Sequence, residues 1–288
     1  MSTVLAGVLP AAVREGDDIV EQPFVEYLWS DLVARRNALS LWPEDIAPLL
    51  GIDLARYREI EEGIFGYVSL RVINDVIAME SFVAEEAEWL VSGAPTEGTV
   101  VLHAVVDQET FTARYPQART TGGTIAYPVS LQYVAVGRAA AELSRRGRDV
   151  EVYRGERHFD LTAARLAVGL GKTETAYLVG RNVKSYYADE KGRKPPSTHS
   201  LGDLRALDDF IVETAGTLEV GVDDRGLDVV WILNNQQEFE KAYPQARGRR
   251  TNQPYPIRAL RIAAARRAHT MEVAGRPTRI ATRSAAPA

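Results

Sequence analysis

The chain has 288 residues, a length that suits about two domains. Hydrophobic residues make up 45% and charged residues 25%, proportions typical of a globular protein. It contains no cysteine, which excludes disulfides, thiolate metal sites and a cysteine nucleophile. The formal net charge of −5 is unevenly distributed, because residues 1–100 hold 6 Lys and Arg against 18 Asp and Glu, whereas residues 101–288 hold 28 against 21. The first part should repel a polyanion, and the remainder should attract one.

The first residues, MSTVLAGVLPAAVREGDD, place no basic residue before their short apolar run, unlike a secretory signal. No apolar run in the chain approaches the roughly 18 residues that suggest a membrane span. We therefore expect a cytoplasmic protein with no membrane association.

The pentapeptide Tyr-Pro-Gln-Ala-Arg occurs at residues 115–119 and again at residues 243–247, a spacing of 128. Further identities occur at this spacing downstream and at a spacing of 129 upstream. A single-residue insertion or deletion reconciles roughly 110 residues of each half, which predicts a tandem duplication. Aligned pairs include Phe111 with Phe239, Tyr57 with Tyr186, and Gly63 with Gly192.

The two halves show the same order of predicted elements after an initial helical segment. Runs rich in β-branched residues favour strands, and the Tyr-Pro pairs end short helices. In chain order the elements are a long amphipathic helix (68–91 and 201–217), an apolar strand (99–106 and 227–233), a short helix ending at Tyr-Pro, a further helix (129–145 and 257–271) and a closing strand (150–153 and 278–282).

The helical segments carry the functional signal. Residues 35–63 predict a short helix, a tight turn at Gly51 and a second helix capped by Asp53. Residues 164–192 repeat the design, with Asn182 as the cap. This is the geometry that lays a second helix in the major groove of DNA.

Both segments resemble the phage-repressor (XRE-type) helix-turn-helix, which ends in Glu-x-Gly; Glu61 with Gly63 and Glu190 with Gly192 occupy these positions. The region after each segment resembles the small α/β dimerisation domain of repressors associated with anti-CRISPR operons, which are single units that pair as homodimers. The resemblance implies a sequence-specific double-stranded DNA-binding regulator that is nucleoid-associated. It also implies repression at a promoter, which the sequence itself does not distinguish from activation.

The expected fold class is α+β, with two tandem repeats arranged as an intramolecular pseudo-dimer. We expect the two α/β modules to pair within the chain, because their apolar strands need a partner surface and a linked copy is at high effective concentration. The expected state is a pseudo-dimeric monomer or a homodimer. The predicted domains are an N-terminal extension (1–22), helix-turn-helix domain 1 (23–95), α/β pairing domain 1 (96–154), helix-turn-helix domain 2 (155–220), α/β pairing domain 2 (221–283) and a disordered tail (284–288).

The two helix-turn-helix segments differ in charge. Residues 35–63 hold four Arg against six acidic residues, whereas residues 160–194 hold seven basic residues against four acidic ones. Because phosphate contacts supply much of the affinity for duplex DNA, the second copy is predicted to be the better DNA reader. The predicted DNA-binding residues are Lys172, Thr173, Thr175, Arg181, Asn182, Lys184, Ser185, Tyr187, Lys191, Arg193 and Lys194, with Arg56 and Arg58 of the first copy.

Two other functions stay open from the sequence. The acidic N-terminal unit suits an antitoxin or another protein-interaction module that binds a protein partner. An RNA-binding regulator is the other, since the same basic helices attract either polyanion. Arg247, Arg249 and Arg250 form either solvated loop charge or an auxiliary phosphate clamp.

An enzyme is not expected, because no catalytic constellation stands out. The run from Gly169 to Thr173 suggests a phosphate loop, but Leu166 stands where that motif needs its first glycine. The four histidines are too widely spaced to predict a metal site, and no other cofactor is expected. Tyr57, Tyr186, Phe111 and Phe239 are expected in the core.

Overall fold

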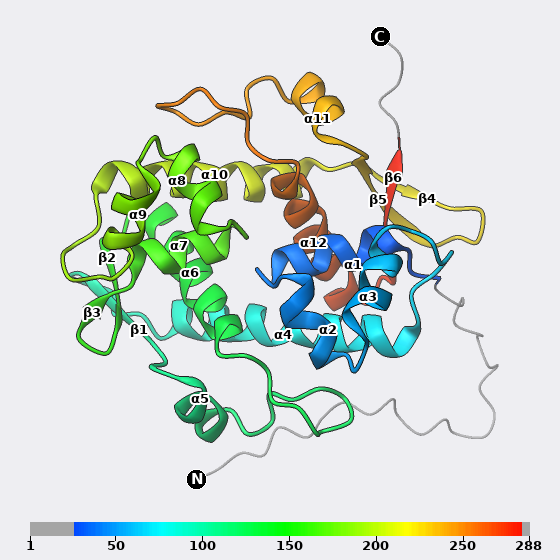
Figure 1. Cartoon of the computed structure of the whole chain (residues 1–288), viewed down its shortest axis with the longest axis horizontal. Helices are drawn as coiled ribbons and strands as arrows, with labels where there is room; N and C mark the ends of the chain where they lie inside the picture. Colours follow the sequence, from blue (N-terminus) through cyan, green and yellow to red (C-terminus); the bar gives the residue numbers. More distant parts are fainter. Residues whose placement is uncertain (1–25, 284–288) are drawn as a thin grey trace.

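The computed structural model describes residues 26–283, which form an α+β fold of twelve helices and two small three-stranded mixed sheets (Figure 1). The predicted N-terminal extension (1–22) and tail (284–288) lie outside the described residues. Within residues 26–283, no helix combines the length and hydropathy needed to cross a membrane.

The predicted order of elements is confirmed in both halves, with ends shifted by a few residues. Two short strands, β3 and β4, were not predicted, because two or three residues are too few to show a period in the sequence. The elements up to residue 154 are α1 (Trp29–Ala38), α2 (Pro43–Leu49), α3 (Leu54–Glu61), α4 (Leu70–Ser92), β1 (Val100–Ala104), α5 (Gln108–Arg114), α6 (Ser130–Arg145) and β2 (Val150–Arg154). The later elements are β3 (Arg157–His158), α7 (Asp160–Ala167), α8 (Lys172–Leu178), α9 (Val183–Asp189), α10 (Thr198–Thr217), β4 (Val220–Val222), β5 (Asp228–Leu233), α11 (Gln236–Ala242), α12 (Arg258–Val273) and β6 (Thr278–Arg283).

Both predicted helix–turn–helix segments are present. Gly51, with φ of 64°, and Gly180, with φ of 61°, make the turns in a left-handed conformation that glycine adopts without strain. The Asp53 carboxylate accepts from the N–H of Ala55, and the Asn182 side chain accepts from the N–H of Lys184, so both residues cap their helices. The two caps are therefore as predicted.

Residues 128 or 129 apart make the same contacts in the two halves. The Arg36 guanidinium pairs with Glu61, and the Arg165 guanidinium pairs with Glu190. The predicted core residues are confirmed, since the side chains of Tyr57, Tyr186, Phe111 and Phe239 are fully buried. Phe82 packs on three aromatic rings and Phe210 on their counterparts: Phe111, Tyr115 and Tyr127 in the first half, and Phe239, Tyr243 and Tyr255 in the second.

The first helix of each half packs on the α/β part of the other half. Helix α1 lies against α12 and β6, and α7 lies against α6 and β2. The Asp31 carboxylate in α1 accepts from the N–H of Ile280 at 2.6 Å. The Asp160 carboxylate in α7 accepts in the same way from the N–H of Val152 at 2.8 Å. Buried polar groups need such partners, so each carboxylate fixes a helix of one half on a strand of the other.

The apolar strands of the two α/β modules do not serve as partner surfaces for each other. The sheet β1-β2-β3 and the sheet β4-β5-β6 share no strand pairing within residues 26–283, and they lie toward opposite ends of the molecule (Figure 1). Their apolar faces are covered by helices instead. Phe159 and Ala163, at the start of α7, complete the core on β1 and β2, and Ala34 and Ala38 of α1 belong to the core around β5. Helices can therefore bury the apolar face of each sheet without a second sheet.

Candidate nucleic-acid interface

Helices α8 and α9 expose mainly polar side chains. Ala176 in α8 and Tyr186 in α9 are fully buried and hold the two helices against the core. Residues three or four positions apart lie on the same face of a helix. The face opposite these buried residues is therefore exposed to solvent in both helices. The predicted residues that are exposed on these helices, between them or just after α9 are Lys172, Thr173, Arg181, Asn182, Lys184, Ser185, Tyr187, Lys191, Arg193 and Lys194.

Thr175 is the exception among the predicted residues. Its side chain is fully buried, and its hydroxyl donates to the Gly171 carbonyl at 2.8 Å. A Thr hydroxyl bonded to the backbone one turn earlier is a common helix contact. Thr175 therefore belongs to the core between α8 and α9 and not to their outer face.

Polar contacts fix the first turn of α8 to α9. The Thr173 and Tyr187 hydroxyls lie 3.1 Å apart. The Lys172 ammonium lies 3.3 Å from the Glu190 carboxylate and 5.5 Å from the centre of the Tyr187 ring. The Arg181 guanidinium pairs with Asp189 at 2.8 Å. These contacts orient the two helices but partly neutralise Lys172 and Arg181.

Four exposed cations on α9 and just beyond it are not neutralised. Within the described chain, no carboxylate lies within ion-pair distance of any of them. Unpaired exposed cations remain available to a polyanion, because no intramolecular ion pair must be broken first. They are Lys184, Lys191, Arg193 and Lys194.

Two further cations beside this group were not predicted. Arg154 and Arg157 come from the β2–β3 hairpin and share a surface hollow with Arg193. The N–H of His158 donates to the Gly192 carbonyl at 3.1 Å, which fixes the hairpin next to the end of α9. Sequence patterns could not reveal these residues, because only the fold brings the hairpin next to the end of α9. We call Lys184, Lys191, Arg193, Lys194, Arg154 and Arg157 the α9 basic face.

The first helix-turn-helix presents a different surface. Its Arg58 pairs with Glu44, and its Arg56 lies 3.4 Å from Glu59 and 3.2 Å from the centre of the Phe65 ring. The two predicted arginines are exposed but already have acidic partners. Exposed apolar residues flank them, since Ile64, Tyr67 and Leu70 have 62%, 66% and 41% of their surface exposed.

The arginine loop after α11 is tied to the protein. Arg250 pairs with Asp203 at 2.8 Å and also donates to the Val179 carbonyl. Arg247 donates to the carbonyls of Pro244 and Asn252. Arg250 and Arg247 therefore position this loop beside α8, whereas Arg249 is exposed.

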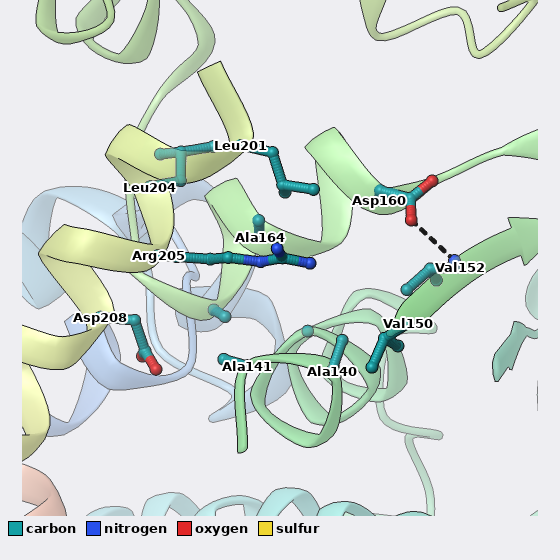
Figure 2. A pocket seen from close by; sticks show the side chains of 12 residues that line it. Ala140, Ala141, Val150, Val152, Asp160, Ala164, Leu201, Leu204, Arg205 and Asp208 are labelled. Atoms are coloured by element: carbon teal, nitrogen blue, oxygen red, sulfur yellow. Dashed lines mark hydrogen bonds between the residues drawn. The ribbon is translucent and has the colours of Figure 1, made fainter. Parts of the chain in front are cut away.

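A small cavity lies where the two halves meet, between α6, α7 and α10 (Figure 2). Ala140 and Ala141 of α6, Ala164 of α7, and Leu201 and Leu204 of α10 make it largely apolar. The Arg205 side chain lies across it (Figure 2). The described residues contain no group of His, Asp and Glu that could hold a metal ion. The cavity therefore supplies no reactive set of groups. The α9 basic face is the strongest candidate site.

No protein-family model matches the chain, and no curated protein matches it significantly.

Proposed function

We propose that the chain is a sequence-specific double-stranded DNA-binding regulator, a repressor in the cytoplasm and nucleoid, whose main DNA-reading element is α9. The observation that carries this proposal is the α9 basic face, a group of exposed cations on and around the second helix of a helix–turn–helix. In this geometry Asn182, Lys184 and Ser185, at the start of α9, face base edges. The cations further along the chain contact phosphates.

The reciprocal contacts between the halves support an intramolecular pseudo-dimer. The Asp31 contact with Ile280 and the Asp160 contact with Val152 are equivalent, as expected if each half exchanges its first helix with the other. Helices α3 and α9 lie toward opposite ends of the long axis of the molecule (Figure 1). One chain would then present two unlike helix-turn-helix units, suited to a site with unlike half-sites.

The first unit favours a second candidate function, the binding of a protein partner. Its exposed Ile64 and Tyr67 follow an acidic run in the chain, and Glu59 and Glu44 neutralise Arg56 and Arg58. An apolar patch rimmed by charge is typical of a protein-binding surface. Two results would support a protein-binding first unit and a DNA-binding second unit. Replacement of Arg56 and Arg58 should leave binding to duplex DNA intact, and Tyr67→Lys should abolish co-purification of a protein partner.

Replacing Lys184 with alanine is expected to weaken DNA binding more than replacing Arg56. Lys184 has no ion-pair partner among the described residues, so its removal should raise Kd about tenfold and lower the salt slope by about one. Arg56→Ala removes a cation that Glu59 already offsets, so Kd should change less than about threefold. Fluorescence anisotropy with a selected duplex over a salt series measures both quantities. The opposite order would assign DNA reading to the first unit, and equal Kd values for RNA and DNA duplexes would favour the RNA-binding alternative.

A further inference from the structure

The two sheets have equivalent strands but unlike edges. Strand β1 pairs in parallel with β2 from Val100 opposite Val150, and β5 pairs in parallel with β6 from Asp228 opposite Thr278, with the same spacing of 128. Strand β5 lies in the middle of its sheet, because β4 pairs antiparallel with its other side. Strand β1 is at the edge of its sheet and has no such neighbour among residues 26–283.

The open edge of β1 leaves backbone groups without partners among residues 26–283. The Val100 N–H donates to the Asp149 carbonyl, on the β2 side, so the alternate residues Val101 and His103 direct their N–H and C=O groups away from β2. The counterpart of His103 is Trp231, whose N–H donates to the Glu219 carbonyl just before β4, at 3.2 Å. The amide of Trp231 is therefore bonded, whereas the equivalent amide of His103 has no partner in the part of the chain that the structure describes.

Side chains on the open edge are also exposed. Val101 has 45% of its surface exposed, whereas its counterpart Val229 is fully buried. A groove runs beside β1, with Trp89 of α4 and Arg114 of α5 on its far side. Trp89 is 60% exposed, and the Arg114 guanidinium lies 5.8 Å from the centre of its ring. The edge thus combines unpaired backbone with apolar surface.

In the second half, β4 covers the edge that is equivalent to the open edge of β1. The counterpart of β4 in the first half does not form a strand. Helix α10 ends at Thr217, and β4 starts at Val220. In the first half, α4 continues through Ser92, which is the counterpart of Val220. Gly93 and Ala94 follow in a turn, so none of the three residues at the place of β4 belongs to a strand. The first described residue, Glu26, is far from the open edge of β1. It pairs with Arg225 in the β4–β5 connection, at the other end of the molecule (Figure 1).

We propose that the open edge of β1 pairs with β1 of a second copy of this chain, as an antiparallel, twofold-symmetric continuation of the sheet. With the twofold axis at Leu102, Val101 of each copy lies opposite His103 of the other. The outward N–H and C=O groups then form two closely spaced hydrogen-bonded pairs, as between β4 and β5. This register places no like charges opposite each other.

The composition of β1 favours self-pairing over an isolated edge. Its sequence, VVLHA, contains none of the Lys, Asp, Glu or Pro residues that usually keep exposed edges from pairing. The other sheet ends in β4, which is only 3 residues long, and very short edge strands are one of those protective devices. Self-association through β1 therefore joins two chains through their first sheets and leaves the second sheets free.

Sedimentation velocity on the full chain, up to about 100 μM, tests this pairing, because small interfaces associate weakly. A concentration-dependent dimer is the expected result. Val101→Lys places a charge on the edge and should raise the dimer Kd at least about tenfold. Val222→Lys adds the same charge at the 66% exposed Val222 on β4, and it should leave the Kd unchanged.

His103→Pro is a second variant, because it removes an outward N–H without adding charge and keeps the β2 side of the ladder. It should also favour the monomer, while circular dichroism checks that all three variants remain folded. A chain that stays monomeric over this range would overturn the proposal, even if the edge binds a foreign peptide. A dimer that Val101→Lys and His103→Pro leave intact would also overturn it.

Discussion

Arg35→Ala is expected to lower the free energy of unfolding by about 3–5 kcal/mol, the usual cost of breaking a buried ion pair. The Arg35 side chain is fully buried in α1, and its guanidinium lies 2.6 Å from both the Glu80 and the Glu272 carboxylates. Glu80 belongs to α4 of the same half, and Glu272 belongs to α12 of the other. Removal of the cation leaves two carboxylates without a partner at the junction of the halves.

The loss should depend on pH. Burial raises the pKa of Glu80 and of Glu272, and the Arg35 guanidinium opposes that rise. Without Arg35 both carboxyls should have pKa values further above those of the unfolded chain. The folded state then holds more protons, so stability falls as pH rises through these values. Chemical denaturation should show a larger deficit near about pH 8 than near about pH 5.

A surface ion pair supplies the control. Arg58 and Glu44 each have 54% of their side-chain surface exposed, so Arg58→Ala should cost less than about 1 kcal/mol at either pH. Equal losses for Arg35→Ala and Arg58→Ala would show that the Arg35 contacts do not hold the halves together.

Gly137→Ala should destabilise the protein by about 3 kcal/mol, in the upper part of the range for overpacking. Gly137 lies in α6 where α7 of the other half crosses it. A Cβ atom there would lie 2.2 Å from the Ala163 carbonyl oxygen and 2.9 Å from the Ala167 Cβ. Backbone atoms cannot move aside as a flexible side chain can, so the two helices must separate.

Gly202→Ala is the matched control for Gly137→Ala. Gly202 is also helical, but a Cβ atom there meets nothing within 4 Å. Alanine at this site should raise stability by up to about 1 kcal/mol, because it lowers the conformational freedom of the unfolded chain. Thermal melts of the two variants should therefore shift in opposite directions. A melting temperature of Gly137→Ala equal to that of the parent protein would contradict the close packing of α6 on α7.

Much of the fold could be predicted from local sequence patterns. The turn glycines, the caps Asp53 and Asn182, and the Tyr-Pro helix ends are set by conformational preferences of a few adjacent residues. The burial of Tyr57 and Tyr186 could be predicted from helical periodicity within the repeat. These features need no knowledge of distant parts of the chain.

The arrangement of the halves could not be predicted from the sequence. Strand composition shows that an apolar face must be covered, but not that α1 and α7 cover the sheets across the two halves. The contact between Asp31 and Ile280 spans most of the chain, and no local pattern signals it. Thr175 was misplaced because a polar side chain at a helix start was assumed to face outward, whereas its hydroxyl bonds to Gly171. Arg154 and Arg157 were missed because only folding brings the β2–β3 hairpin beside Gly192.

Selection of bound sequences from a random duplex pool by the full chain, repeated over a salt series, tests DNA reading through α9 most directly. The proposed function predicts an enriched sequence motif, a Kd that rises steeply with salt, and loss of that enrichment in Lys184→Ala. Steep salt dependence without any enriched motif would contradict sequence-specific regulation. The absence of binding to any duplex would contradict DNA reading through α9 altogether.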